Sequence, residues 1–333
     1  METAASRFRF SGAASVRGIL AMLSPRITAA LTGILPAVLL FVAIGTPAQT
    51  PPVNSAQPLP APVQTSVAKE LTLNPALPTV FIVGDSTARN QANLGWGDHL
   101  ARYFDTSRIN VANRAIAGRS SRTFINEGHW DKVLAEMKPG DYVLLQLGHN
   151  DGGALDGPKP RGTLRGLGEE SKDVPQMDGH VETVHTFGWY QRKYIAETRA
   201  RHATPILLTL TVRNIWTAGA DGRQRIERDM GYDAAIRQLA SDQQVLLVDM
   251  ANYEADHLEA VGPEKTALLF PLDHTHSSAE GAELNAQIFV RALRATQSPL
   301  IGYLAQGISW PEIATPSLTA APATNKSAEG AVK

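Results

Sequence analysis

The sequence predicts an α/β fold, a three-layer α/β/α sandwich with a parallel five-stranded sheet as its middle layer. The first observation is a set of five short runs of consecutive apolar residues, which is the pattern of strands covered on both faces. The second is that segments with helical spacing separate most of these runs, because alternating strands and helices build parallel sheets. In such folds the active site lies at the carboxyl ends of the strands.

The predicted strands cover residues 79–83, 109–112, 142–147, 205–210 and 245–248. The predicted helices cover residues 130–137, 181–202, 228–243 and 279–296. A polar, glycine-rich segment without clear periodicity, residues 152–180, precedes the second of these helices. A long loop beside the catalytic edge of the sheet either shapes substrate specificity or is a mobile surface insertion.

The composition is that of a globular protein, with 43% hydrophobic and 19% charged residues in a chain of 333. The formal net charge of −1 gives no electrostatic reason to expect a nucleic acid partner. The chain has no cysteine, which excludes disulfides, a catalytic thiol and cysteine-ligated zinc.

The two ends of the chain differ from its middle. Four arginines precede an apolar stretch at residues 27–44, and the small residues Thr46-Pro47-Ala48 end it. This order predicts a signal peptide, residues 1–48, and an exported, periplasmic or extracellular protein. The alternative is an uncleaved membrane anchor, because the stretch is close to the ~20 residues that span a bilayer. We expect a Pro/Ala-rich linker at 49–76, the folded domain at 77–310 and a disordered tail at 311–333.

The segment Gly84-Asp85-Ser86-Thr87 follows the first predicted strand. A serine just past a strand, where a helix can begin, can expose its hydroxyl and point its backbone N–H at a developing oxyanion. The alternative is an ordinary helix cap, because Ser, Asp and Thr all cap helices well.

Two further candidates follow the second and third strands. Gly118 can let a backbone N–H approach a substrate closely, and Asn150 offers a side-chain amide donor at the same sheet edge. Each has a plainer interpretation as a turn residue, because Gly and Asn-Asp-Gly-Gly favour turns.

The segment Asp273-His274-Thr275-His276 precedes the last predicted helix. A serine is a poor nucleophile until a base takes its proton, and the base is usually oriented by a carboxylate. The three-residue spacing lets Asp273 reach the imidazole of His276. The competing hypothesis is a metal site formed by Asp273, His274 and His276, since His-x-His is a common ligand spacing.

Taken together, these four segments resemble, in order, the four blocks of the SGNH/GDSL hydrolase superfamily, from residue 79 to about residue 293. The resemblance implies a flavodoxin-like sandwich in which Ser86 is the nucleophile, His276 the general base and Asp273 its orienting group. It also implies an oxyanion hole made by the N–H groups of Ser86 and Gly118 and the side chain of Asn150. No metal and no organic cofactor are implied.

Within that superfamily the chain is most similar to rhamnogalacturonan acetylesterases, which remove acetyl groups from pectin. The similar segments are Gly95-Trp96-Gly97, residues 117–124, Glu127-Gly128 and the Asp-His-Thr-His form of the last block. Residues 211–214 are similar too, but depart from a Pro-Val-x-Arg form, which puts the role of Arg213 in doubt. The implied partner is an acetylated polysaccharide or oligosaccharide. The substrate-binding candidates are Trp96, Arg119, His149, Arg213 and His274.

Rival hypotheses remain at this point. The blocks do not separate a pectin acetylesterase from a xylan acetylesterase, a lipase-like esterase or a thioesterase. A non-catalytic glycan-binding protein on the same fold would have no need of Ser, Asp and His together. A metal-dependent hydrolase that uses the two histidines of the last block would lose its activity to a chelator.

Overall fold

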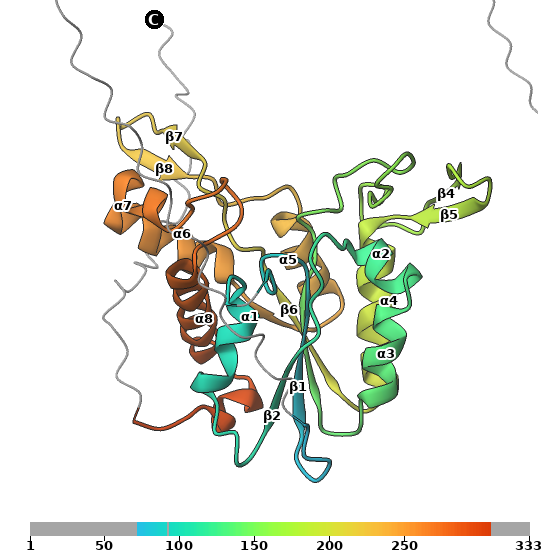
Figure 1. Cartoon of the computed structure of the whole chain (residues 1–333), viewed down its shortest axis with the longest axis horizontal. Coiled ribbons are helices and arrows are strands. Elements are labelled where there is room, and N and C mark those ends of the chain that lie inside the picture. Colours follow the sequence, from blue (N-terminus) through green and yellow to red (C-terminus); the bar gives the residue numbers. More distant parts are fainter. Residues whose placement is uncertain (1–71, 92, 308–333) are drawn as a thin grey trace, which may run out of the picture. The chain divides into compact units, whose positions relative to one another are not determined.

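The computed structural model describes residues 72–91 and 93–307 (Figure 1). The predicted signal peptide or anchor at 1–48 and the predicted tail at 311–333 lie outside the described residues, as does most of the predicted linker. Within the part that is described, no helix is long and apolar enough to cross a membrane.

A parallel sheet of five strands forms the centre of the fold, in the order β2-β1-β3-β6-β9. Its strands are β1 (Thr79–Gly84), β2 (Asn110–Asn113), β3 (Tyr142–Gln146), β6 (Thr204–Leu208) and β9 (Leu246–Val248). Numbered within the sheet alone, the order is 2-1-3-4-5, which is the flavodoxin-like winding. The predicted fold class and all five predicted strands are confirmed, with shifts of one or two residues at their ends.

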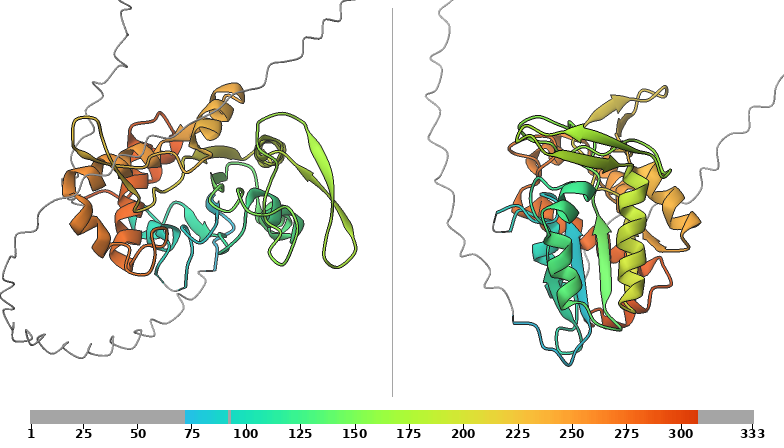
Figure 2. Two further views of the ribbon diagram at one scale, coloured as in Figure 1. Left: turned by 90° about the horizontal axis from the view of Figure 1, so that it is seen from above. Right: turned by 90° about the vertical axis from the view of Figure 1, so that its right-hand side faces the viewer.

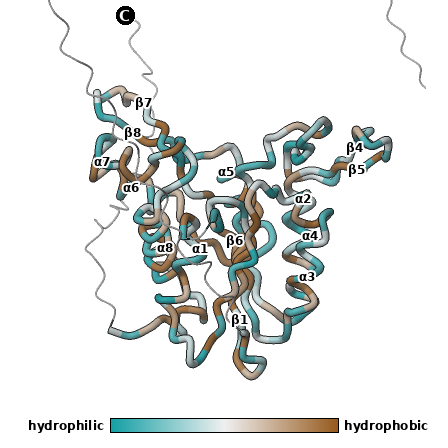
Figure 3. Tube along the Cα trace, viewed as in Figure 1, coloured by the Kyte–Doolittle hydropathy of each residue, from teal (hydrophilic) through white to brown (hydrophobic). Residues whose placement is uncertain are grey.

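Helices cover both faces of this sheet. Side chains alternate between the two faces along each strand, so each strand presents apolar side chains to both helical layers. Val80 and Ile82 of β1 pack on the face covered by α1 (Trp96–His99) and α8 (Ala279–Arg294). Phe81 and Val83 pack on the other face. That face is covered by α2 (Ser121–Asn126), α3 (His129–Glu136), α4 (Phe187–Ala200) and α5 (Asp233–Asp242). The apolar strands therefore lie between two helical layers (Figure 3).

The remaining elements are four helical segments and two hairpins. The helical ones are η1 (Leu100–Tyr103), α6 (Met250–Val261), α7 (Pro263–Leu268) and η2 (Pro299–Tyr303). The others form two hairpins, β4 (Ser171–Pro175) with β5 (Val181–His185), and β7 (Trp216–Ala218) with β8 (Gln224–Ile226). Both hairpins lie at the upper end of the molecule in Figure 1, and Figure 2 shows them projecting from the same end.

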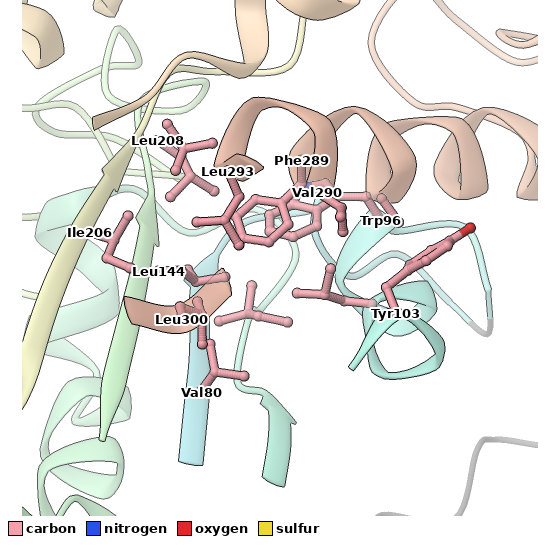
Figure 4. Packing of buried hydrophobic residues seen from close by; sticks show 14 of the residues in the cluster. Val80, Trp96, Tyr103, Leu144, Ile206, Leu208, Phe289, Val290, Leu293 and Leu300 are labelled. Atoms are coloured by element: carbon pink, nitrogen blue, oxygen red, sulfur yellow. The ribbon is translucent and has the colours of Figure 1, made fainter. Parts of the chain in front are cut away.

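The structure corrects the expectation that Trp96 contacts substrate. Its side chain is fully buried in the core below α8, where it stacks on Phe289 with ring centroids 5.5 Å apart (Figure 4). Its indole N–H donates to Gln146 Oε1 at 2.7 Å, which satisfies the one polar atom of the ring. A side chain enclosed in this way has no face left for a sugar.

Two predicted helices begin later than expected. Residues 181–185 are strand β5 rather than helix, and they pair antiparallel with β4 from within the segment predicted to lack structure. Helix α4 begins only after Thr186, whose hydroxyl accepts the N–H of Trp189 at 3.1 Å. In the third predicted helix, residues 228–232 are not helical, because Gly231 adopts a φ of +93° immediately before α5.

Candidate active site

Ser86 lies in a tight turn directly after β1. The Asp85 carboxylate accepts the N–H and the hydroxyl of Thr87 at 2.9 and 3.0 Å, and the Asp85 carbonyl accepts the N–H groups of Ala88 and Arg89. The expectation that a helix can begin at this serine is wrong, because the chain makes a single turn and α1 starts only at Trp96. Ser86 therefore projects from a turn that its own neighbour, Asp85, fixes.

The segment Gly95-Trp96-Gly97 packs against this turn. The N–H groups of Trp96 and Gly97 donate to the carbonyls of Thr87 and Ala88 at 3.1 and 3.0 Å. A Cβ at position 95 would lie 2.4 Å from the backbone of Ala88, so only glycine fits there. The motif that suggested sugar binding thus supports the turn that carries Ser86.

Ser86, His276 and Asp273 form one chain of hydrogen bonds. His276 Nε2 lies 2.9 Å from Ser86 Oγ, and His276 Nδ1 lies 2.7 Å from Asp273 Oδ2. Because a carboxylate only accepts, Nδ1 carries the proton and Nε2 is free to accept the serine hydroxyl. The loop before α8 holds this arrangement, since Asp273 Oδ1 also accepts the N–H groups of Thr275 and His276 at 2.6 and 2.7 Å.

These contacts keep Asp273 ionised. Partial burial raises the pKa of the Asp273 carboxyl, but the hydrogen bonds from the His276 side chain and from the two backbone N–H groups outweigh it and bring the pKa to about 2. A carboxylate that stays charged at neutral pH can orient an imidazole and stabilise its protonated form.

A pocket of about 450 Å³ opens beside Ser86 and His276, and Gly118 and Asn150 line it. Within the described residues, the backbone N–H groups of Ser86 and Gly118 donate to no other protein group. Gly118 has a φ of +79°, which a residue with a Cβ would rarely adopt. Asn150 Nδ2 donates one hydrogen to the Arg119 carbonyl at 2.9 Å and has a second hydrogen left to donate. Three residues that line this pocket therefore each have an N–H left to donate.

A buried ion pair lies beneath the pocket. His149 Nδ1 is 3.3 Å from Asp85 Oδ2, with side-chain exposures of 3% and 0%, and His149 Nε2 lies 2.9 Å from the Thr211 carbonyl. Burial raises the pKa of Asp85, but the charge of His149 and the hydrogen bonds from His149 and Thr87 outweigh burial. The pKa of Asp85 is therefore lowered. Burial lowers the pKa of His149, but Asp85 and the bond to Thr211 raise it above its ordinary value. Both ring nitrogens of His149 face oxygen acceptors, so the contacts are those of an imidazolium beside a carboxylate.

Two more buried carboxyl groups hold the segment that follows β6. Asp233 Oδ1 accepts the N–H of Leu210 at 2.7 Å, and Glu254 Oε2 accepts the N–H of Val212 at 2.8 Å. Burial raises the pKa of Glu254 to about 8. No local sequence pattern predicts these contacts, which fix the backbone next to Arg213.

The third block is fixed in a similar way. Asp151 is fully buried and accepts the backbone N–H of Ser121 at 3.1 Å and its hydroxyl. Burial raises the pKa of Asp151 to about 7, against the hydrogen bonds from Ser121. This contact joins the turn that carries Asn150 to the start of α2.

The remaining substrate-binding candidates divide into two groups. His149 and Arg213 line the pocket. Arg119 points instead to Glu127, with its Nε 2.7 Å from the carboxylate, and His274 is exposed and does not line the pocket. The structure thus gives no support to substrate contacts by the side chains of Arg119 and His274.

Ala117 and Thr275 line the pocket beside predicted residues, and Asn90 and Arg161 line it from positions that were missed from the sequence. Their positions depend on how two loops fold, which no local pattern reveals.

The competing hypothesis was a metal site. Among residues 72–91 and 93–307 no three His, Asp or Glu side chains are arranged to hold a metal ion.

Comparison with known proteins gives a consistent result. Residues 82–284 match the GDSL-like lipase/acylhydrolase family. A rhamnogalacturonan acetylesterase of Emericella nidulans is 33% identical over 215 residues, which cover 65% of this chain and 84% of the relative. A probable rhamnogalacturonan acetylesterase of Bacillus subtilis is 28% identical, over 66% of this chain and 94% of its own length.

The similarity extends to a solved structure. The crystal structure of the Bacillus subtilis protein YxiM superposes with a TM-score of 0.53 and 29% identity. The match covers 66% of this chain and 56% of YxiM, so this chain spans little more than half of that protein. With a matching family model over most of the described residues and the sheet order given above, the chain belongs to the GDSL-like lipase/acylhydrolase family and is a carboxylic ester hydrolase.

Proposed function

We propose that this chain is an exported serine acetylesterase that removes acetyl groups from a pectic polysaccharide, rhamnogalacturonan. The observation that carries the proposal is the unbroken chain of hydrogen bonds from Ser86 Oγ through His276 to Asp273, at the edge of a pocket lined by Gly118 and Asn150. A nucleophile, an oriented base and convergent N–H donors are the parts that acyl transfer requires.

In the proposed reaction, Ser86 Oγ attacks the acetyl carbonyl carbon while His276 Nε2 takes the hydroxyl proton. The oxyanion that forms accepts hydrogen bonds from the N–H groups of Ser86 and Gly118 and from Asn150. The bond to the sugar oxygen then breaks, and His276 returns its proton to that oxygen. Water repeats these steps on the acetyl-enzyme, which releases acetate and restores Ser86. Asp273 stabilises the imidazolium of His276 in both halves of the reaction.

Two relatives support the choice of a pectic substrate. One is a rhamnogalacturonan acetylesterase and the other is a probable rhamnogalacturonan acetylesterase. A xylan acetylesterase or another acyl esterase with the same blocks is the alternative. The chemistry at Ser86 would be the same in either case, so only the sugar distinguishes the two.

The test is acetate release from a panel of acetylated polysaccharides that includes rhamnogalacturonan, homogalacturonan and xylan. We expect release to be fastest from rhamnogalacturonan, and Ser86→Ala to lower turnover by about a million-fold. Ser107→Ala is the matched control, because Ser107 is an exposed serine in a turn outside the pocket. Faster release from xylan would refute the pectic substrate, and near-normal activity of Ser86→Ala would refute the mechanism.

Export is a separate part of the proposal. The basic and apolar order of residues 7–48 supports cleavage after Ala48. Protein recovered from the culture medium or periplasm of its host should begin near Gln49. Recovery of the uncut chain from the membrane fraction would instead favour an anchor.

A further inference from the structure

Two arginines line the pocket together with Gly118 and Asn150. Arg161 comes from the 152–180 segment, and its Nη1 lies 3.5 Å from the Gly118 carbonyl. Arg213 comes from the segment after β6, and its Nη2 lies 3.4 Å from the His149 carbonyl. Both are long contacts to neutral oxygens, which leave most of the N–H groups of each guanidinium free to donate.

The charge of these arginines is not balanced locally. In the described part of the chain neither Arg161 nor Arg213 forms an ion pair with a carboxylate, whereas Arg119 pairs with Glu127 only a short distance away. None of the described residues that line the pocket is Asp or Glu. The Nε of Arg213 is buried without a hydrogen-bond partner. A buried donor that lacks a partner is costly, so its partner is expected to come with a ligand.

The segment that carries Arg161 is held firmly in place. Arg122 of α2 is 1% exposed, and its Nη1 donates to the carbonyls of Leu155 and Gly162 at 3.1 and 2.8 Å. The same guanidinium pairs with Glu182 of β5 through Nε at 2.7 Å. The buried guanidinium of Arg122 therefore anchors Gly162, the residue next to Arg161. This contact fixes the backbone from which Arg161 reaches the pocket.

We propose that Arg161 and Arg213 form a carboxylate-binding subsite, which makes the enzyme select an acetylated sugar that carries, or is next to, a uronic acid. This rests on the proposed function and adds to it the group that is recognised and the residues that recognise it. A guanidinium presents a planar fork of N–H donors that matches a carboxylate, and two such forks would hold one acid group beside the ester. Arg161 also explains what the 152–180 segment contributes to the site.

The direct test compares two small substrates that differ only in charge: an O-acetylated methyl galactosiduronate and its 6-methyl ester, with acetate release as the readout. We expect kcat/KM to be about 10- to 100-fold higher for the acid, the range of charge-assisted hydrogen bonds. Arg161→Gln and Arg213→Gln should each reduce this preference by about tenfold, chiefly through KM, because the contact is made equally in the ground and transition states.

The matched control is Lys159→Gln, which removes one positive charge from an exposed position of the same segment, outside the pocket. It should leave the ratio of acid to methyl ester as in the wild type. Equal kcat/KM for acid and methyl ester in the wild type would overturn the subsite. So would arginine variants that lose activity equally on both substrates, which is the result expected if the guanidinium groups act on the oxyanion or on released acetate.

A second measurement separates this proposal from the proposed function. Free galacturonate should inhibit the hydrolysis of 4-nitrophenyl acetate competitively, and Arg161→Gln should weaken this inhibition by about tenfold. If neither acetylated uronate is deacetylated but this inhibition depends on Arg161, the pectic function is wrong and the subsite stands. If the acid and its methyl ester are both deacetylated equally well, the function stands and the subsite is wrong.

Discussion

Removing the carboxylate of Asp85 should destabilise the protein more than most single substitutions. Asp85 and His149 face each other at 3.3 Å with almost no exposure, so each is the counter-ion of the other. In Asp85→Ala, His149 would lose the counter-ion that stabilises its second proton, and the two hydrogen bonds from Thr87 would be lost as well. Breaking a buried pair from one side typically costs about 3–5 kcal/mol, and we expect Asp85→Ala to lie in that range.

Asp85→Asn should cost much less, about 1–2 kcal/mol. The amide oxygen can still accept from Thr87, and the amide N–H can donate to Nδ1 of a neutral His149, whose Nε2 continues to donate to the Thr211 carbonyl. The matched control is Asp105→Ala. Asp105 accepts the N–H and hydroxyl of Ser107 in a similar turn but lies at the surface without a buried partner, so its loss should be far smaller.

The pair should also give the stability a characteristic pH dependence. The raised pKa of His149 contributes stability that is complete below the ordinary value of 6.5 and is lost as the pH rises through the folded value. The lowered pKa of Asp85 contributes stability that is present above 3.8 and is lost as the pH falls through the folded value. The difference between wild type and Asp85→Ala should therefore be greatest between these two limits.

Urea unfolding followed by tryptophan fluorescence measures these differences, because the free energy of unfolding extrapolates linearly to zero denaturant. Measurements at a series of pH values from about 5.5 upwards follow the contribution of His149, whose pKa is raised from its ordinary value of 6.5. A cost below about 1 kcal/mol for Asp85→Ala, or a difference from wild type that does not change as the pH rises, would refute the ion pair.

Three further predictions follow from the site. His276→Ala should lower kcat by about a million-fold, whereas His274→Ala, an exposed side chain outside the pocket, should lower it by less than about tenfold; equal losses in a kinetic assay would favour the metal hypothesis. Glu254→Gln should leave the free energy of unfolding at pH 7 unchanged or raise it. Burial raises the pKa of Glu254 from 4.5 to about 8, so this carboxyl destabilises the folded state more and more as the pH rises above 4.5. A large loss of stability in urea unfolding would contradict the burial argument. Incubation with a chelator followed by an esterase assay should leave the rate unchanged, and restoration of a lost rate by zinc would exclude the serine mechanism.

The sheet could be predicted from the sequence because burial on both faces leaves a local record. Residues 80–83 and 143–145 are apolar at every position, and the structure places them side by side in β1 and β3. Hairpin β4–β5 left no such record. It is exposed along most of its length, and residues 181–185 run directly into α4, so strand and helix merged into one apparent helical pattern.

The site was partly predictable for a similar reason. The loops after parallel strands meet at one edge of the sheet, so Ser86, Gly118 and Asn150 could be grouped before any distance was known. Whether a side chain points into the core or into the pocket is a tertiary property. Trp96 packs into the core between Gly95 and Gly97. Both positions require glycine because the backbone of Ala88 lies too close for a Cβ. Arg161 reaches Gly118 across 43 residues of chain, and nothing near it in the sequence marks that approach.

The buried carboxylates under the site share one physical cause. Where a parallel strand ends, the next backbone N–H groups lose their partners in the sheet, yet they lie in the interior and must be satisfied. Asp85 accepts the N–H of Thr87 after β1, Asp233 that of Leu210 and Glu254 that of Val212 after β6. Asp151 does the same for Ser121 at the start of α2. Each carboxylate thus fixes a loop that carries a pocket residue or lies next to one, and the raised pKa values of Asp151 and Glu254 reflect the cost of burial. An apolar replacement would remove that cost and, with it, the acceptor that holds the loop in place.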